Sequence, residues 1–204
     1  MFYDSNHIRM IPVEILEAHN ATVKSYAKDA TIFTEGSAAQ FYFQIKSGKV
    51  KAYNLTEDGK EFTQGFFESG NSFGEPPLIG EFEYPATTVC TEDSSIYVLP
   101  KAAFFDLLKA HPDIHLQITQ IISKRMMYKA TTLKEISIHP PEHRILTLLN
   151  YLKQTANSDA LYEVDLTRQQ ISELTGLRVE TVIRAIKKLE KEHKLSIKDR
   201  KVYL

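Results

Sequence analysis

Two oppositely charged side chains in the C-terminal part of the sequence have the types and spacing to recognise nucleic-acid bases. Glu180 and Arg184 lie four residues apart in GLRVETVIRAIKKLEKE, so a helix would place them on one face. An arginine can donate two hydrogen bonds to guanine, and a glutamate can accept one from cytosine. The alternative is an exposed ion pair between the two, which would stabilise the helix by about 0.2–0.5 kcal/mol. Their position at the start of the helix favours base contacts.

The charge around this pair also indicates a polyanionic partner. Residues 166–204 contain ten Lys or Arg against five Asp or Glu, although the whole chain has a net charge of −1. A solvated helix face is the alternative explanation for such a run of charge. Phosphate contacts add affinity without sequence choice. The candidates for such contacts are Thr167, Arg168, Gln169, Arg178, Thr181, Lys187, Lys188, Lys198 and Arg200.

A helix-turn-helix pattern must position these side chains. Thr167 is expected to cap a first helix over residues 168–174. Ser172 is small where two helices cross closely, Gly176 permits a left-handed turn, and Val182 would bury the second helix. The segment LSIKDRKVYL then predicts a strand, a two-residue turn and a second strand. Together these elements predict a winged helix.

The N-terminal half has the rhythm of an all-β structure. Glycines recur every ten to twelve residues between Gly36 and Gly80, and the runs between them include FYFQI, KVKAYNL and EFTQGFF, with SIYVL following. This spacing predicts an antiparallel β-roll of the jelly-roll type over residues 30–99, with a hairpin turn at residues 57–60 and a short helical segment before the roll. Alternation in FYFQI places Phe41, Phe43 and Ile45 on one face of a strand.

A long helix is predicted between the two halves. Residues 102–111 form a helix that should stop before Pro112, and residues 113–137 then run without Gly or Pro. Apolar residues on this second helix form a seam, namely Ile114, Ile118, Ile122, Met126, Leu133 and Ile136. The seam either packs on the chain's own roll or pairs with the same helix of a second subunit, and we favour the dimer. The predicted α+β fold therefore has a roll (1–111), a dimerisation helix (112–138) and a winged helix-turn-helix (139–204).

The composition excludes several classes of protein. With 43% hydrophobic and 25% charged residues, the chain is typical of a soluble globular protein. Its single cysteine, Cys90, excludes an internal disulfide and any iron-sulfur cluster or zinc site that needs four thiolates from this chain. No apolar run reaches the ~20 residues of a membrane span, and the N-terminus lacks the pattern of a secretory signal. We expect a cytoplasmic protein without a membrane partner.

The histidines indicate neither a metal site nor an enzyme. All seven lie outside the strands predicted over residues 30–99, namely His7, His19, His111, His115, His139, His143 and His193. Two pairs, at 111 and 115 and at 139 and 143, have i,i+4 spacing, but the neighbouring prolines argue against a helical metal pair. A metal enzyme of the cupin type would need histidines alternating on its strands. We therefore expect no catalytic residues and no metal.

The chain resembles the Crp/Fnr family of bacterial transcription regulators over nearly its full length. The resemblance is carried by TRQQISELTGLRVETVIRAIKKLEKE, by FGE in the roll and by the order of the domains. It implies a homodimer that binds a two-fold symmetric double-stranded operator and recruits or blocks RNA polymerase, with Glu180 and Arg184 as the base-reading pair. Val179 departs from the family, which usually has arginine there. The alternative is a cyclic-nucleotide or metabolite sensor that acts through a protein partner.

The same resemblance defines a possible effector pocket. Family members that bind cyclic nucleotides use a Gly-Glu pair, and an Arg-Ser or Arg-Thr pair eleven residues after the Gly. Gly74 and Glu75 match the first pair, whereas Pro85 and Ala86, followed by Thr87, occupy the positions of the second. A buried phosphate needs paired charge and hydrogen bonds, and proline supplies neither a cation nor an N–H group. Cyclic AMP is therefore not expected, and no other cofactor is indicated.

Overall fold

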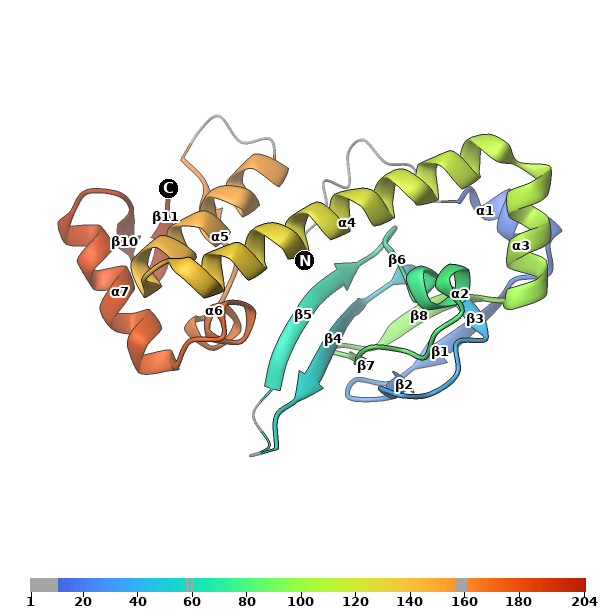
Figure 1. The fold of residues 1–204 in the computed structure, drawn as a ribbon, viewed down its shortest axis with the longest axis horizontal. Helices are drawn as coiled ribbons and strands as arrows, with labels where there is room; N and C mark the ends of the chain where they lie inside the picture. The colour runs from blue at the N-terminus through green and yellow to red at the C-terminus, as the bar shows by residue number, and fades with distance from the viewer. Residues whose placement is uncertain (1–10, 58, 60, 157–160) are drawn as a thin grey trace. The chain divides into compact units, whose positions relative to one another are not determined.

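The computed structural model describes residues 11–57, 59, 61–156 and 161–204 (Figure 1). Within this range the chain forms two units, one over residues 11–124 and one over Arg125–Leu204, and the boundary lies inside the long helix α4, Pro112–Ile138. His7, the start of the predicted roll domain at residue 1, and two positions of the predicted turn at 57–60 lie outside the described residues.

The first unit is an antiparallel β-roll, as predicted. One sheet has the strand order β1-β8-β3-β6 and the other β2-β7-β4-β5. The strands are β1 (Thr22–Tyr26), β2 (Thr31–Phe33), β3 (Phe41–Ser47), β4 (Lys49–Leu55), β5 (Glu61–Glu68), β6 (Ser72–Phe73), β7 (Thr87–Cys90) and β8 (Ser94–Pro100). The predicted start of the roll at residue 30 is wrong, because β1 lies before it. Four of the five β1 residues are exposed, so the strand has no apolar alternation to reveal it.

Both faces of β3 are buried, although the alternation predicted only one buried face. Phe43 and Ile45 point between the two sheets and belong to an apolar cluster there. On the opposite face, Tyr42 stacks on Phe104 with ring centroids 4.8 Å apart. Gln44 is also buried, and its polar atoms are satisfied by the Tyr42 hydroxyl and by a carbonyl near the N-terminus. The second face is covered by helices, which a strand pattern alone does not show.

Four helices accompany the roll. They are α1 (Val13–Ala18), α2 (Glu75–Gly80), α3 (Lys101–Ala110) and the first part of α4. The break between α3 and α4 falls before Pro112, as predicted, and His111 ends α3 with an N–H···O bond of 2.9 Å to Leu107. Proline suits the first position of the next helix because that residue's N–H has no partner within the helix. Helix α2 was not predicted, because it lies inside the segment assigned to the strands and turns of the roll.

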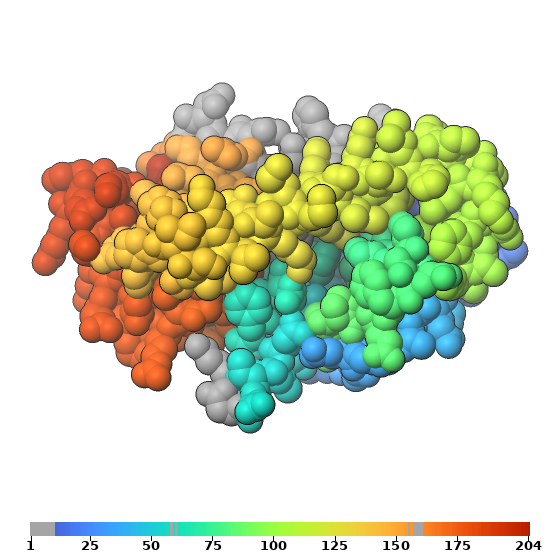
Figure 2. Space-filling model, viewed as in Figure 1, coloured from blue at the N-terminus to red at the C-terminus, as the bar shows by residue number. Residues whose placement is uncertain are grey.

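The apolar seam of α4 divides into two parts. Ile114 and Ile118 are both 2% exposed and belong to the core of the chain's own roll, and Ile122 packs against the same core. The assignment of Ile114 and Ile118 to a subunit interface is corrected, because a side chain already buried in its own unit cannot pair with a second helix. Ile122 is half-buried. Met126 and Leu133 are 69% and 67% exposed. The yellow part of α4 lies at the surface in Figure 2.

The second unit has the architecture of a winged helix. Helices α5 (Pro141–Thr155), α6 (Arg168–Thr175) and α7 (Val179–Lys191) pack around buried Ile145, Leu149, Ile171, Val182 and Ile186. The strands β9 (Glu163–Val164), β10 (Ser196–Lys198) and β11 (Lys201–Tyr203) form an antiparallel sheet in the order β10-β11-β9. The predicted α+β fold is confirmed. Among the described helices, none combines the length and apolarity required to cross a membrane.

Candidate nucleic-acid interface

The start of α6 is fixed by a capping box. The Thr167 hydroxyl accepts a hydrogen bond of 3.1 Å from the Gln170 N–H, and the Gln170 side chain accepts one of 2.8 Å from the Thr167 N–H. Two backbone donors that the helix itself cannot satisfy are thus paired reciprocally. The helix begins at Arg168, where the sequence placed it.

Removing this cap should weaken the second unit. We expect Thr167→Ala to lower the free energy of unfolding by about 1 kcal/mol, because the Gln170 N–H loses its acceptor. Thr167→Ser keeps the hydroxyl and should remain close to wild type. Urea unfolding of both variants, followed by circular dichroism, checks this. Equal stability of the alanine and serine variants would show that the cap contributes nothing.

The turn between α6 and α7 depends on two small residues. Gly176 ends α6 with φ 66°, in the left-handed region that glycine adopts without steric cost. Ser172 is 2% exposed, and its hydroxyl donates a hydrogen bond of 2.6 Å to the Leu177 carbonyl. The sequence predicted that Ser172 is a small residue at a close helix crossing, whereas its hydrogen bond into the turn is a finding of the structure. Both features fix where α7 begins relative to α6.

Helix α7 has a buried face and a charged face. Val182, Ala185, Ile186 and Leu189 are buried at helical spacing. Glu180, Arg184 and Lys187 are exposed and lie on the opposite side of the helix. Among the described residues, no ion pair joins Glu180 to Arg184. The alternative explanation of their spacing, an i,i+4 pair, is therefore not what the structure shows.

One further cation belongs to the charged face. Lys191 is exposed and follows Lys187 by four residues and Arg184 by seven, so helical periodicity places all three on one stripe. Lys191 was not among the predicted contact residues, although the same periodicity would have identified it.

Some predicted phosphate contacts are exposed around this helix. Arg178 is the exposed N-cap residue of α7, and Thr181 is half-buried in its first turn. Lys198 and Arg200 are exposed in the hairpin between β10 and β11, where Asp199 and Arg200 have φ 48° and 66°. These positive φ values match the tight turn that the sequence predicted.

Other predicted contacts are engaged within the unit. Lys188 forms an ion pair of 2.8 Å with Glu142 of α5, which raises the pKa of Lys188 and lowers that of Glu142. Arg168 is half-buried and donates a 3.5 Å hydrogen bond to the Arg200 carbonyl, and burial lowers the pKa of its guanidinium. Gln169 donates a 2.8 Å hydrogen bond to Glu173. Lys188 is thus an exposed cation whose ion pair links α7 to α5.

In the first unit, Gly74 and Glu75 form a closely packed turn. Gly74 has φ 82°, and a Cβ added there would lie 3.2 Å from the Phe43 ring. Glu75 is completely buried at the start of α2, and one of its carboxylate oxygens accepts a hydrogen bond from the Ser72 hydroxyl. The Glu75 carboxylate therefore connects β6 to α2.

The positions that would hold a phosphate show no cation. Pro85 is exposed, and its carbonyl accepts a 2.8 Å hydrogen bond from the Asn54 side chain. Ala86 is buried, and the Thr87 hydroxyl accepts a 3.0 Å hydrogen bond from the Glu35 N–H. Next to Pro85, the Tyr84 ring stacks on Phe33 with centroids 3.7 Å apart, and burial raises the pKa of its phenol. Aromatic side chains thus fill the roll beside the predicted pocket.

The crowding at Gly74 can be separated from its backbone conformation. Gly74→Ala should destabilise the roll by more than the ~1–2 kcal/mol expected for a left-handed residue, because the new methyl group presses on Phe43. Gly70→Ala is the matched control, since Gly70 has φ 85° but no atom within 4 Å of an added Cβ. Thermal unfolding of both variants measures the difference. A smaller loss for Gly74→Ala than for Gly70→Ala would contradict the close packing.

Comparison with known proteins assigns both units to described families. Residues 23–111 match the cyclic nucleotide-binding domain, and residues 143–204 match the Crp-like helix-turn-helix domain. The fumarate and nitrate reduction regulatory proteins of Yersinia pestis and Escherichia coli strain K12 are each 26% identical to this chain over 179 residues, covering 86% of this chain and 71% of theirs.

Solved structures show the same fold. The c-di-GMP responsive global regulator CLP of Xanthomonas campestris has a TM-score of 0.76 at 22% identity, covering 94% of this chain and 97% of that one. A CooA mutant of Carboxydothermus hydrogenoformans has a TM-score of 0.75 at 21% identity, with 95% and 86% covered. The matches to both domains and to these relatives, together with the capped helix-turn-helix described above, show that the chain belongs to the Crp/Fnr family of DNA-binding transcription regulators.

Proposed function

We propose that this regulator binds a two-fold symmetric operator as a homodimer and reads it with α7. The observation that carries the proposal is the exposed face of α7, where Glu180 and Arg184 project away from the buried side. In helix-turn-helix proteins the second helix enters the major groove, and its N-terminal residues contact base edges. Both residues lie in the first two turns of α7. Arg184 pairs with guanine and Glu180 with cytosine.

The cations around α7 hold the phosphate backbone. Arg178 and Lys187 flank the base-reading pair, and Lys198 and Arg200 extend from the hairpin. Thr167, Gln169 and Thr181 can add neutral hydrogen bonds, and Lys191 can add charge. We assign Lys188 a supporting role, since its ion pair with Glu142 holds α7 on α5. Arg168 likewise supports the hairpin through the Arg200 carbonyl.

The C-terminal part of α4 forms the subunit interface. Met126 and Leu133 lie seven residues apart, the spacing of a coiled-coil seam, and Ile136 follows Leu133 by three. Large exposed apolar side chains on one helix are a typical sign of an interaction surface. Met127 and Ile138, which are 69% and 68% exposed, add apolar area on the same helix.

This interface can be tested by one substitution and a matched control. We expect Leu133→Lys to weaken dimerisation by about tenfold or more, because it buries an unpaired charge in the seam. Leu116→Lys makes the same change at an exposed leucine of α4 that lies 17 residues before Leu133 and outside the seam, and should leave the dimer intact. Sedimentation equilibrium measures both. Identical dimer affinities for the two variants would place the interface elsewhere.

Cyclic AMP is not the effector in this proposal. Its phosphate would meet Pro85 and Ala86 where a cation and a hydroxyl are needed, and Glu75 is bonded to Ser72. No iron-sulfur cluster can be built on the single thiol of Cys90, whose pKa burial raises. Micromolar cyclic AMP should leave the melting temperature unchanged, whereas clear stabilisation would overturn this part.

The dimer on its operator would act on RNA polymerase by recruiting or blocking it, as its family membership implies. Since DNA and RNA polymerase are both cytoplasmic in bacteria, we place the regulator in the cytoplasm.

Selection of binding fragments from genomic DNA tests the function. It should enrich a symmetric site whose half-sites are about one helical turn, 10 base pairs, apart. Failure to enrich any common sequence would instead favour a sensor that acts through a protein partner.

A further inference from the structure

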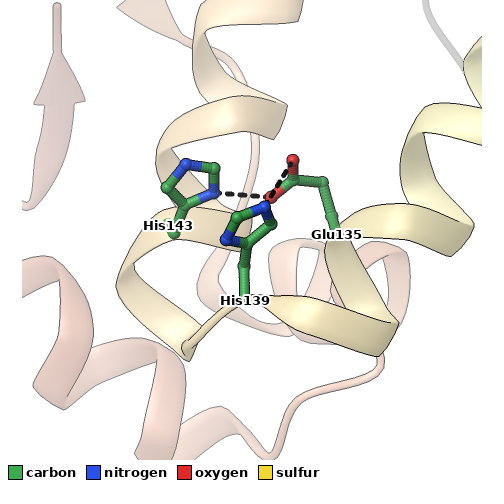
Figure 3. Close-up of side chains that lie close together, drawn as sticks. All are labelled: Glu135, His139 and His143. Carbon is green, nitrogen blue, oxygen red and sulfur yellow. Dashed lines mark hydrogen bonds and ion pairs between the residues drawn. The ribbon is translucent and has the colours of Figure 1, made fainter.

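Three potential metal ligands meet where α4 gives way to α5 (Figure 3). Glu135 lies near the end of α4, His139 follows the last residue of that helix, and His143 lies in the first turn of α5. One ligand atom from each residue lies within 4.8 Å of the other two. The two imidazole rings stack with centroids 3.9 Å apart. We propose that Glu135, His139 and His143 form a binding site for a divalent transition-metal ion such as Zn²⁺.

The distances are close to those of a zinc site. Zn²⁺ binds imidazole nitrogen and carboxylate oxygen at 2.0–2.2 Å, so tetrahedral ligand atoms lie about 3.3 Å apart. Glu135 Oε2 is 2.6 Å from His143 Nδ1, and Glu135 Oε1 is 4.0 Å from His139 Nε2. One separation is shorter and the other longer than the ideal. Small side-chain rotations would make both compatible with one ion.

The backbone around the cluster is held in place by hydrogen bonds. Arg144 Nε donates to the His139 carbonyl at 2.8 Å, and its Nη2 donates to the Ile136 carbonyl at 2.6 Å. The His139 N–H donates to the Glu135 carbonyl at 3.1 Å. The guanidinium is a neighbouring positive charge, but these bonds direct it to the carbonyls at the end of α4. The ligand positions are thus organised before any ion binds, which reduces the cost of binding.

The burial of the three ligands suits an ion with an open coordination position. Glu135 is 9% exposed, His139 is half-buried and His143 is exposed. Three protein ligands leave a coordination position open, and the exposure of His143 allows water to fill it. Two imidazoles and one carboxylate favour Zn²⁺, Ni²⁺ or Cu²⁺ over Mg²⁺ or Ca²⁺, which prefer oxygen ligands. The Thr147 hydroxyl, 3.5 Å from His143 Nδ1, lies within reach of the same imidazole.

A bound ion would link two helices with different roles. Glu135 belongs to α4 and His143 to α5, which packs against α6 and α7. An ion bound by both residues would stabilise the arrangement of α4 and α5 in which all three ligands reach it, relative to arrangements in which they do not. If α4 forms the dimer and α7 reads DNA, the ion then changes operator affinity. This consequence rests on the proposed function, whereas the metal site itself does not.

Calorimetric titration of the full chain with ZnCl₂, after chelator treatment and removal of the chelator, tests the site. We expect saturable binding that is weakened by about tenfold or more in Glu135→Gln and in His143→Gln, since each removes one of three ligands. His115→Gln, at an exposed histidine of α4 outside the cluster, should bind as wild type does. MgCl₂ should produce no saturable binding. Circular dichroism confirms that the variants fold.

Two outcomes would overturn the site: no saturable zinc binding by the wild-type protein, or equal binding by wild type, Glu135→Gln and His143→Gln. Operator affinity with and without ZnCl₂ tests the consequence separately. A zinc effect that is present in wild type and lost in His143→Gln supports the link between α4 and α7. Zinc binding without any change in operator affinity would retain the site and overturn the link. Loss of operator binding in all conditions would instead contradict the proposed function.

Discussion

Arg184→Ala is expected to remove most of the regulator's sequence preference while leaving its fold intact. Arg184 is exposed on α7, and among the described residues no hydrogen bond or ion pair joins its side chain to another group, so its loss leaves no buried group unpaired. A bidentate arginine–guanine contact contributes about 1–3 kcal/mol of discrimination, which corresponds to roughly 5- to 150-fold in relative affinity. Binding to DNA that lacks the operator should change much less, because phosphate contacts supply most of that affinity.

Lys198→Ala is the matched control for this prediction. Lys198 is an exposed cation of the hairpin, where it can contact phosphate but is not placed on α7. Its loss should weaken binding to operator and to non-operator DNA by a similar factor, and should reduce the salt dependence of both affinities. Competition titrations with the two duplexes separate the effects. If Arg184→Ala and Lys198→Ala weaken binding to all DNA sequences by the same factor, the division into base-reading and phosphate contacts is wrong.

Ile186→Ala should cause the largest loss of stability. Ile186 is 1% exposed on the inner side of α7, where it helps to hold that helix on α5 and α6. Replacing a buried isoleucine with alanine typically costs about 2–5 kcal/mol, because burial is lost and a cavity remains. The loss is expected in the second unit, and DNA binding should fall with it.

Ile183→Ala makes the same change three residues earlier on α7, where the side chain is 39% exposed. It should cost far less, since little of the removed surface is buried. Urea unfolding followed by circular dichroism compares the two variants at equal protein concentration. Similar stabilities would mean that α7 is not anchored by the side that the structure buries.

The winged helix was the part of the structure that the sequence predicted best. Thr167, Ser172 and Gly176 act through contacts with residues at most five positions away, so local chemistry decides where α6 ends and α7 begins. The strands β3 and β4 were predicted for a similar reason, since alternation and glycine turns are local signals. The ion pair between Lys188 and Glu142 joins residues 46 positions apart, and no local pattern contains it.

Elsewhere the same local signals were insufficient. No helix was predicted within the roll, but proline is tolerated in the first turn of a helix, and α2 begins at EPPLIG. The seam of α4 was correctly identified as apolar, yet periodicity cannot tell whether Ile114 and Ile118 pack on their own roll or on a partner. The sequence prediction considered His139 and His143 only as an i,i+4 pair within one helix, and the neighbouring prolines argued against such a pair. The structure brings them together across a helix end, with Glu135.

The central claim is that a homodimer of this chain recognises one DNA sequence through α7. Fluorescence anisotropy titration of the intact protein, with its selected operator and with a scrambled duplex of equal length, tests this most directly at several salt concentrations. We predict that the operator binds about 10³-fold or more tightly than the scrambled duplex. For both duplexes, the logarithm of the association constant should fall linearly with the logarithm of salt concentration. Equal affinity for the two duplexes, or no salt-dependent binding to either, would contradict the account.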